Sequence, residues 1–114
     1  MTEYGAYMGK VLMIDLNTRT TSEYPWTDKD RHRTIGGKIM AGTILLDHVR
    51  PGMTAYDEDN WIVITTGPLT GTGTPSTSRF NISTISPLTG LVTSSNSGGD
   101  FGLMLKRCGY DGCI

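Results

Sequence analysis

The 114-residue chain has few of the features that direct a protein to a membrane, to nucleic acid or out of the cell. No apolar run approaches the ~20 residues that a membrane-spanning helix needs. The N-terminal MTEYGAYMGK also lacks the basic and apolar regions of a secretory signal. Because 10 Lys and Arg residues face 11 Asp and Glu, no positive excess exists for nucleic acid or an anionic membrane. These absences predict a cytoplasmic protein with no membrane or nucleic-acid partner.

Familiar catalytic and metal-binding patterns are absent as well. Cys108 and Cys113, even with His32 and His48, fall short of a zinc or iron–sulfur ligand set. The cysteines are therefore expected to be free thiols, and His48 to be structural. There is no Ser–His–acid or Cys–His ordering, no Walker motif and no Gly-x-Gly-x-x-Gly after a strand. Residues 55–60 (AYDEDN) are acidic, but their spacing matches no calcium loop.

Glycine, serine and threonine instead dominate a long stretch at residues 67–99. Arg79 is the only charged residue in it. Pro-Leu-Thr-Gly occurs twice, at 68–71 and 87–90, and Asn-Ser-Gly-Gly at 96–99 closes the stretch. Because backbone NH groups and hydroxyls dominate, such a surface suits a polar, phosphate-bearing ligand better than an apolar one.

Apolar periodicity predicts an α+β domain, rich in β-strand, with two or three helices. Alternating or continuous apolar runs mark strands at 9–16, 20–24, 61–66, 79–85 and 90–95. The first two are expected to form a hairpin that ends at Pro25, because proline has no NH to donate. The third (WIVITT) is apolar on both faces and belongs in the middle of a sheet. The charged residues 28–33 (DKDRHR) are expected to form a solvated surface turn.

Helical spacing occurs in two segments, 37–49 and 100–107. The expected buried face of the first comprises Ile35, Ile39, Gly42, Leu46 and Val49, widened by Ile44 and Leu45. That of the second comprises Phe101, Met104 and Leu105. Gly42 indicates either a close approach to a sheet or a merely tolerated glycine. The second helix is expected to end at Cys108–Gly109, since glycine is the usual residue after a helix end.

Two features of the glycine- and hydroxyl-rich stretch can bind an anion. Residues 96–99 lead into the second helix, whose N-terminal NH groups would attract phosphate. The alternative is that Asn96 or Ser97 simply caps the helix. Arg79 either holds an anion or polar heterocycle with its planar guanidinium or is an exposed strand-end arginine. Asp100 would repel a bare phosphate, and a divalent cation between them would remove that objection.

The order of the motifs resembles that of a known family. The series is GKVLMIDL at 9–16, a glycine-led helix, GPLTGT at 67–72, SRFN at 78–81, SPLTG at 86–90 and NSGGDFG at 96–102. It resembles the N-terminal domain of the aldehyde ferredoxin oxidoreductases, enzymes that carry a tungsten bis-pyranopterin cofactor and a 4Fe–4S cluster. The resemblance covers essentially all of residues 1–114.

The resemblance implies a base of two β-sheets on which the two pterins lie. Arg79 would lie between a pterin and the iron–sulfur cluster. Asn96, Ser97, Gly98 and Gly99 would contact the phosphate end of the cofactor, and the backbone carbonyl of Asn96 would help ligate a magnesium ion that bridges the two pterin phosphates. No residue of the chain is expected to be catalytic.

This chain also departs from the family pattern. Members are much longer, and their cluster cysteines lie in later domains, so Cys108 and Cys113 are not assigned to iron. Thr77-Ser78 stands where many members have Gly-Gly before the arginine. Because a strand starts at 110–114 with no closing element after it, residues 1–114 are expected to be an incomplete N-terminal domain that is inactive alone.

The parent activity implied is oxidation of an aldehyde to its carboxylic acid, or the reverse, at tungsten or molybdenum. Electrons would pass through the cluster to ferredoxin, another iron–sulfur carrier or a partner subunit. Expected partners are the remaining domains or subunits, and a homo-oligomer is possible. Three alternatives stay open: part of an aromatic acyl-CoA reductase of the same family, a non-catalytic module that binds pterin or a partner, and a generic nucleotide- or phosphate-binding domain.

Overall fold

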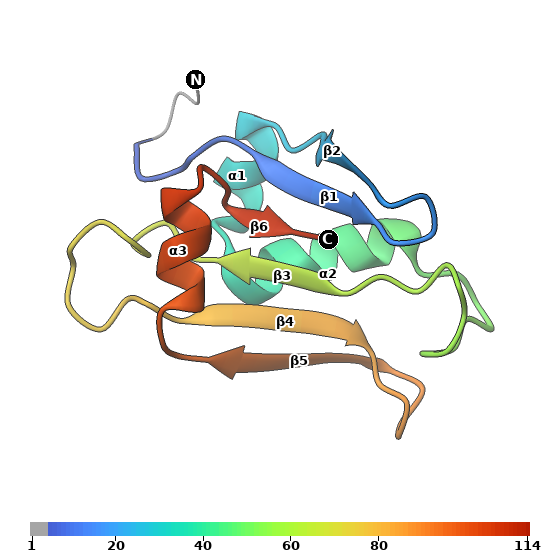
Figure 1. Ribbon diagram of the computed structural model, residues 1–114. Coiled ribbons are helices and arrows are strands. Elements are labelled where there is room, and N and C mark those ends of the chain that lie inside the picture. The colour runs from blue at the N-terminus through green and yellow to red at the C-terminus, as the bar shows by residue number, and fades with distance from the viewer. Residues whose placement is uncertain (1–4) are drawn as a thin grey trace.

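The computed structural model describes residues 5–114, which form a six-stranded sheet with helices on both faces (Figure 1). The strands are β1 (Val11–Asp15), β2 (Thr20–Tyr24), β3 (Val63–Thr66), β4 (Phe80–Ile85), β5 (Val92–Ser97) and β6 (Gly112–Cys113). The helices are α1 (Asp28–Thr34), α2 (Gly37–His48) and α3 (Phe101–Arg107). The predicted α+β class is confirmed, whereas the two sheets implied by the resemblance are a single sheet within residues 5–114.

The strand order is β2-β1-β6-β3-β4-β5. All neighbouring pairs are antiparallel except β1 and β6, which are parallel. The predicted hairpin of β1 and β2 is confirmed, and so is the central place of β3. The short strand β6 joins the hairpin to the rest of the sheet, with Gly112 beside Val11. A Cβ at Gly112 would lie 2.7 Å from the backbone oxygen of Ile64, so only glycine fits between these strands.

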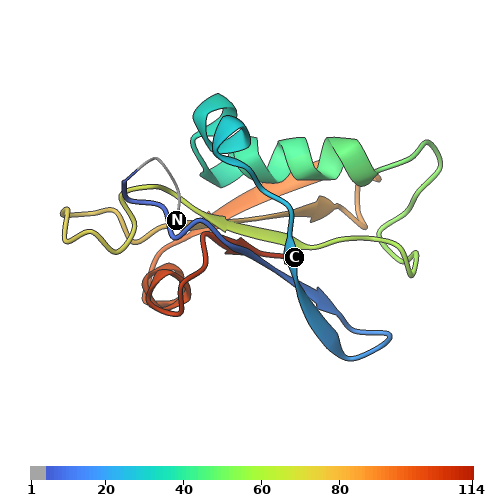
Figure 2. The same cartoon turned by 90° about the horizontal axis from the view of Figure 1, so that it is seen from above.

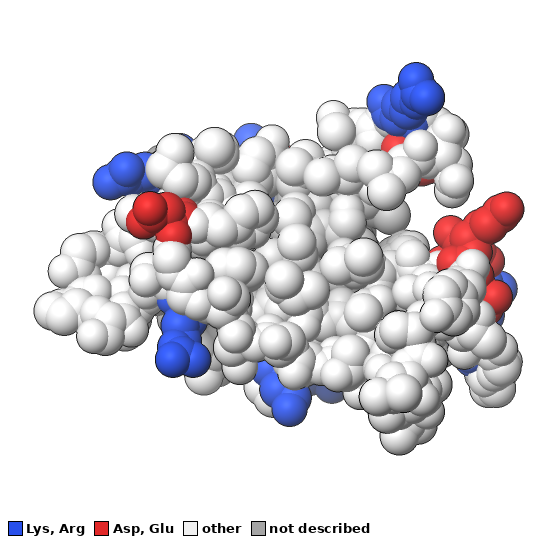
Figure 3. Space-filling model, turned by 60° about the horizontal axis from the view of Figure 1, so that its bottom comes forward, with Lys and Arg blue, Asp and Glu red and all other residues white. Residues whose placement is uncertain are grey.

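The core lies between the sheet and the two helices α1 and α2, which cover one face (Figure 2). Its buried side chains are Val11, Trp26, Met40, Ala41, Ile44, Leu45 and Val63. Among residues 5–114, α3 is the one helix on the other face, at one end of the sheet (Figure 2). Strands β3 to β6 contain no charged residue. Seen from the β5 side, the surface is correspondingly broad and uncharged, with charged side chains at its margins (Figure 3).

The predicted buried face of α2 is confirmed at Ile44 and Leu45, which are 0% exposed, but it is wrong at other positions. Ile39 is 62% exposed and Leu46 79% exposed, and a Cβ at Gly42 would meet nothing within 4 Å. Gly42 is therefore a tolerated glycine. The helix is apolar on both sides, so periodicity alone offers two possible inner faces. The sheet selects the one that begins at Gly37, whose backbone oxygen accepts a bond from Thr65, and ends at His48, whose ring stacks on Trp61 at 3.6 Å.

The surface turn predicted for residues 28–33 is in fact the helix α1. Thr27 and Asp30 form a capping box: the Asp30 NH donates to Thr27 Oγ1 (3.3 Å) and the Thr27 NH donates to Asp30 Oδ2 (3.0 Å). Reciprocal capping of this kind satisfies two free donors of a helix start. Arg31, in the middle of the charged run, is only 4% exposed. The run was misread because a buried arginine needs partners that lie far away in the sequence.

The predicted cap of α3 is also wrong. Strand β5 continues through Asn96 and Ser97, so neither residue caps the helix, and Asp100 precedes α3 without a side-chain capping bond. The expected apolar face is wrong too, since Phe101 and Met104 are 47% and 50% exposed. The buried residues of α3 are Gly102 and Lys106. The predicted end at Cys108–Gly109 is confirmed.

Candidate functional site

The antiparallel pairing of β4 and β5 brings the two predicted binding segments together. Phe80 lies opposite Ser97, and Asn81 opposite Asn96. Arg79 directly precedes β4 and Gly98 directly follows β5, so these two residues meet at the same end of the sheet. We call Arg79 together with Asn96, Ser97, Gly98 and Gly99 the β4–β5 site. Sequence patterns identified its members but not that they lie side by side.

Arg79 has a free side chain. Its residue is exposed, and within residues 5–114 its guanidinium makes no hydrogen bond or ion pair. The backbone around it is well held: Thr70, 3% exposed, donates its hydroxyl to the backbone oxygen of Thr77 at 2.8 Å, and the oxygen of Arg79 lies 3.5 Å from the same hydroxyl. A fixed backbone with an unpaired cation can hold an anion or a polar ring without first breaking an internal contact.

A buried amide network supports the β5 half of the site. Asn81 is 1% exposed, and its Nδ2 donates to Asn96 Oδ1 (3.0 Å) and to Ser94 Oγ (2.7 Å). Ser83 donates to Asn81 Oδ1 at 2.7 Å. Sequence reasoning did not single out Asn81, although an asparagine inside an alternating strand is a signal for a buried polar contact. The network fixes the Asn96 side chain on β5, the last strand of the sheet.

The glycines that follow β5 leave the backbone open. A Cβ built at Gly98 or Gly99 would meet nothing within 4 Å, and Gly99 has φ +98°. Ser97 is exposed beside them. An unpaired guanidinium, exposed hydroxyls and bare glycine backbone fit the phosphate end of an anionic group. Asp100 directly follows Gly99 and is exposed, and its carboxylate would repel a bare phosphate.

A buried charge cluster at the C-terminal end of α3 was missed by the sequence reasoning. Lys106 Nζ donates to Asp111 Oδ1 at 2.7 Å, and Arg31 Nε lies 3.9 Å from Asp111 Oδ2. All three residues are at most 4% exposed. Asp111 also accepts the backbone NH groups of Met8 (3.0 Å) and Gly9 (2.9 Å). Because its members come from four separate segments, no local pattern could have revealed it.

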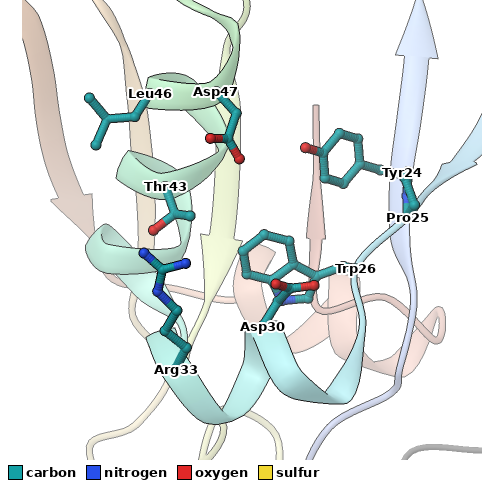
Figure 4. A pocket seen from close by; sticks show the side chains of 8 residues that line it. All are labelled: Tyr24, Pro25, Trp26, Asp30, Arg33, Thr43, Leu46 and Asp47. Atoms are coloured by element: carbon teal, nitrogen blue, oxygen red, sulfur yellow. The ribbon is translucent and has the colours of Figure 1, made fainter.

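Two hollows of the described surface contain no residue of the β4–β5 site. One, of about 210 Å³, is lined by Tyr24, Pro25, Trp26, Asp30, Arg33, Thr43, Leu46 and Asp47 (Figure 4). Burial, followed by the carboxylates of Asp47 and Asp30, raises the pKa of Tyr24. The other, of about 300 Å³, is an apolar groove between α2 and strands β4 and β5. Neither shows a catalytic arrangement.

The structure also bears on the cysteines and histidines considered as metal ligands. Cys108 and Cys113 are free, as predicted, and burial raises the pKa of the Cys113 thiol. Within residues 5–114, no three His, Cys, Asp or Glu side chains gather to hold a metal ion. His48 is structural: its Nε2 lies 2.6 Å from the backbone oxygen of Asp59. In the same range, no helix has the length and apolar character to cross a membrane.

Comparison with known proteins decides the family. Residues 11–114 match the model of the aldehyde ferredoxin oxidoreductase N-terminal domain. The chain belongs to the aldehyde ferredoxin oxidoreductase family. It is 35% identical over 111 residues to the tungsten-containing aldehyde ferredoxin oxidoreductases of Pyrococcus furiosus and Thermococcus kodakarensis, and this match covers 97% of the chain. It is also 32% identical over 112 residues to a P. furiosus aliphatic sulfonate oxidoreductase, WOR-like subunit.

A solved structure has a closely similar fold. The active-site complex BamBC of benzoyl coenzyme A reductase, in complex with 1,5-dienoyl-CoA, matches with a TM-score of 0.91 and 31% identity. That match covers 96% of this chain and 17% of the other. The chain likewise spans about 18% of the length of the curated aldehyde ferredoxin oxidoreductases that it matches. The comparisons therefore concern one portion of larger proteins.

Proposed function

We propose that residues 1–114 form the N-terminal cofactor-binding portion of a tungsten or molybdenum pterin oxidoreductase. The observation that carries the proposal is the meeting of Arg79 with residues 96–99 at one end of the sheet. Family membership supplies the cofactor class, since tungsten-containing relatives match over nearly the whole chain. The unpaired guanidinium, the open glycines and the buried amide network supply the chemistry that such a cofactor needs from the protein.

Each residue of the β4–β5 site has a distinct task in this proposal. Arg79 orients a pterin ring and offsets negative charge between it and an iron–sulfur cluster held by other parts of the protein. Gly98 and Gly99, with Ser97, receive the phosphate end through backbone NH and hydroxyl groups. The backbone carbonyl of Asn96 would help hold a magnesium ion at the phosphate end. The bound metal pterin supplies two-electron redox chemistry.

The reaction proposed for the whole protein is aldehyde oxidation. An aldehyde and water give a carboxylic acid, two electrons and two protons, and the electrons leave through a 4Fe–4S cluster to ferredoxin or a similar carrier. We assign no residue of this chain as a ligand of that cluster. The chain's own role is to bind and orient the pterin cofactor. The remaining domains or subunits would be its direct partners, in a cytoplasmic homo-oligomer or complex.

A second candidate is reduction of an aromatic acyl thioester. It rests on the TM-score of 0.91 with the benzoyl coenzyme A reductase complex. Thr77-Ser78, which precedes Arg79, is the part of the chain where the site differs from the family pattern. Turnover of an aldehyde against an aromatic acyl-CoA by the complete protein distinguishes the two reactions.

The test is the metal content of the complete protein, purified natively without oxygen. We expect about one tungsten or molybdenum atom per copy, with iron from a cluster of four, in the wild type. Arg79→Ala should lose most of the tungsten or molybdenum while iron remains. The matched control is Arg19→Ala, which removes an exposed arginine in the β1–β2 turn. A folded wild-type protein without tungsten or molybdenum would overturn the enzyme proposal and favour a binding module.

A further inference from the structure

Helix α3 touches both halves of the β4–β5 site. Its first residue, Phe101, comes shortly after Gly99, and its second, Gly102, lies against the backbone on either side of Arg79. A Cβ at Gly102 would lie 3.3 Å from the backbone oxygen of Ser78 and 3.4 Å from the Cβ of Phe80. The rings of Phe101 and Phe80 are 4.9 Å apart. Helix α3 thus follows the Gly98–Gly99 turn in the chain and packs against the segment that carries Arg79.

The far end of α3 is anchored independently of the site. Lys106 Nζ donates to Asp111 Oδ1 (2.7 Å) and to the backbone oxygen of Ala6 (2.8 Å). Gly71, in the loop before β4, packs against the same lysine, because a Cβ there would lie 3.4 Å from Lys106 Cβ. A buried lysine with these partners holds one position, since moving it would leave a charge without its counter-ion.

The kind of contact that holds α3 on the sheet determines how well the position of the helix is fixed. Gly102 and Lys106 are the buried residues of α3, while Phe101 and Met104 remain about half exposed. A helix held by apolar burial can slide, because that force has no direction. A helix held by a glycine contact and a hydrogen-bonded ion pair has little freedom to shift.

We propose that α3 sets the spacing between Arg79 and residues 96–99, with Gly102 as a positioning residue and Lys106 as its anchor. The inference rests on the proposed function, because the spacing between Arg79 and residues 96–99 matters only if both bind the same cofactor. A side chain at position 102 would push Ser78–Phe80, and Arg79 with it, away from the turn at Gly98–Gly99.

The first test compares two glycine substitutions, Gly102→Ala and Gly42→Ala, in the 114-residue chain. Both place alanine in a helix, where it is intrinsically favoured over glycine. Gly42 has open space around it, so Gly42→Ala serves as the matched control. Gly102→Ala should shift the NMR amide signals of residues 78–80 and 97–99 and speed their hydrogen exchange by about tenfold, as expected for moderate overpacking. The control should change neither segment.

The second test removes the anchor with Lys106→Met and uses Arg107→Met, an exposed cation on the same helix, as its control. Hydrogen exchange should accelerate in α3 and at residues 78–80 and 97–99, and stay unchanged in the β1–β2 hairpin. An equal acceleration across the whole chain would show a purely global role and overturn the proposal. This test decides the matter if Gly102→Ala does not fold.

The outcomes are separable from those of the metal analysis, because both exchange experiments use the chain without cofactor. Unchanged signals at 78–80 and 97–99 in Gly102→Ala would overturn the positioning role even if the complete protein contains tungsten. Shifted signals in a protein that never binds metal would leave the positioning intact and refute the proposed function. A second substitution is a further check. Gly102→Ser should shift the same signals as Gly102→Ala, since any Cβ at this position meets the backbone oxygen of Ser78.

Discussion

The two faces of the sheet hold their helices by different kinds of interaction. On one face, α2 buries the apolar side chains Met40, Ala41, Ile44 and Leu45, each at most 2% exposed. On the other, α3 buries a glycine and a lysine that is paired with Asp111. Apolar burial stabilises without fixing direction, whereas close backbone contact and ion pairing fix one geometry. The helix that adjoins the β4–β5 site is the one held by directional contacts.

The largest expected effect comes from breaking the charge cluster on the α3 face. Asp111→Asn leaves the buried Lys106 without a carboxylate partner and leaves Arg31 with Asp28 alone (2.9 Å), which should lower the free energy of unfolding by about 3–5 kcal/mol. Urea denaturation measures the loss. The control is Asp59→Asn, which breaks the exposed pair with Arg50 (2.6 Å) and should cost about 1 kcal/mol or less. Equal losses in the two variants would contradict the claim that the buried cluster stabilises the fold more than an exposed ion pair does.

A loss almost as large is expected on the α2 face. Ile44 is 0% exposed, so Ile44→Ala should cost about 2–5 kcal/mol through lost burial and a cavity. Leu46→Ala, on the exposed side of the same helix, should change the free energy of unfolding by about 0.5 kcal/mol or less. Hydrogen exchange adds a sharper check on the comparison. Ile44→Ala should accelerate exchange throughout the chain, unlike the local effect expected for Lys106→Met.

A smaller, pH-dependent effect is expected at α1. Hydrogen bonds from the side chain and then the backbone of Thr27 lower the pKa of Asp30. Its folded-state pKa lies below the unfolded value, so the capping stabilisation is complete above about pH 4 and fades as the pH falls through the lowered pKa. Asp30→Asn should therefore cost about 1 kcal/mol or less at neutral pH, because the carboxylate is largely solvated. Urea midpoints of the two proteins should converge in acid, and a constant difference would refute this account.

The smallest effect is kinetic and concerns the two thiols. Burial raises the pKa of Cys113, whereas Cys108 is exposed at the end of α3. Since the thiolate is the reactive form, iodoacetamide at mildly alkaline pH should modify Cys108 first. Mass spectrometry of the digested protein follows both sites. In urea the two rates should become similar, and a persistent difference would mean that burial is not the cause.

The sequence predicted the elements that depend on local patterns. The β1–β2 hairpin, the central strand β3 and the end of α3 at Gly109 all follow from alternation, an all-apolar run and turn chemistry. It failed where partners are distant. Ile44 and Leu45 of α2 were placed correctly in the core, but Ile39 and Leu46 were placed on the wrong side, because they have the same helical spacing as residues that face the sheet.

The members of the candidate site were predictable, but their surroundings were not. Arg79 stood out as the lone charge in its stretch, and Asn96–Gly99 as a motif of the resembling family. The role given to Asn96 in a helix cap was wrong because β5 runs two residues further than its pattern suggested. No sequence pattern singled out Lys106 and Asp111, since burial of a charge depends on partners that only the fold brings near.

The place of β6 has a consequence for the order in which the chain can fold. Residues 112 and 113 lie between β1 and β3, which are built from much earlier residues. During synthesis the hairpin of β1 and β2 can form early, and so can the meander of β3 to β5, but the two cannot join into one sheet until residue 113 is free to pair. Ribosome-bound chains that stop before Gly112 should therefore contain two separate pieces of sheet, and closure should be the late step.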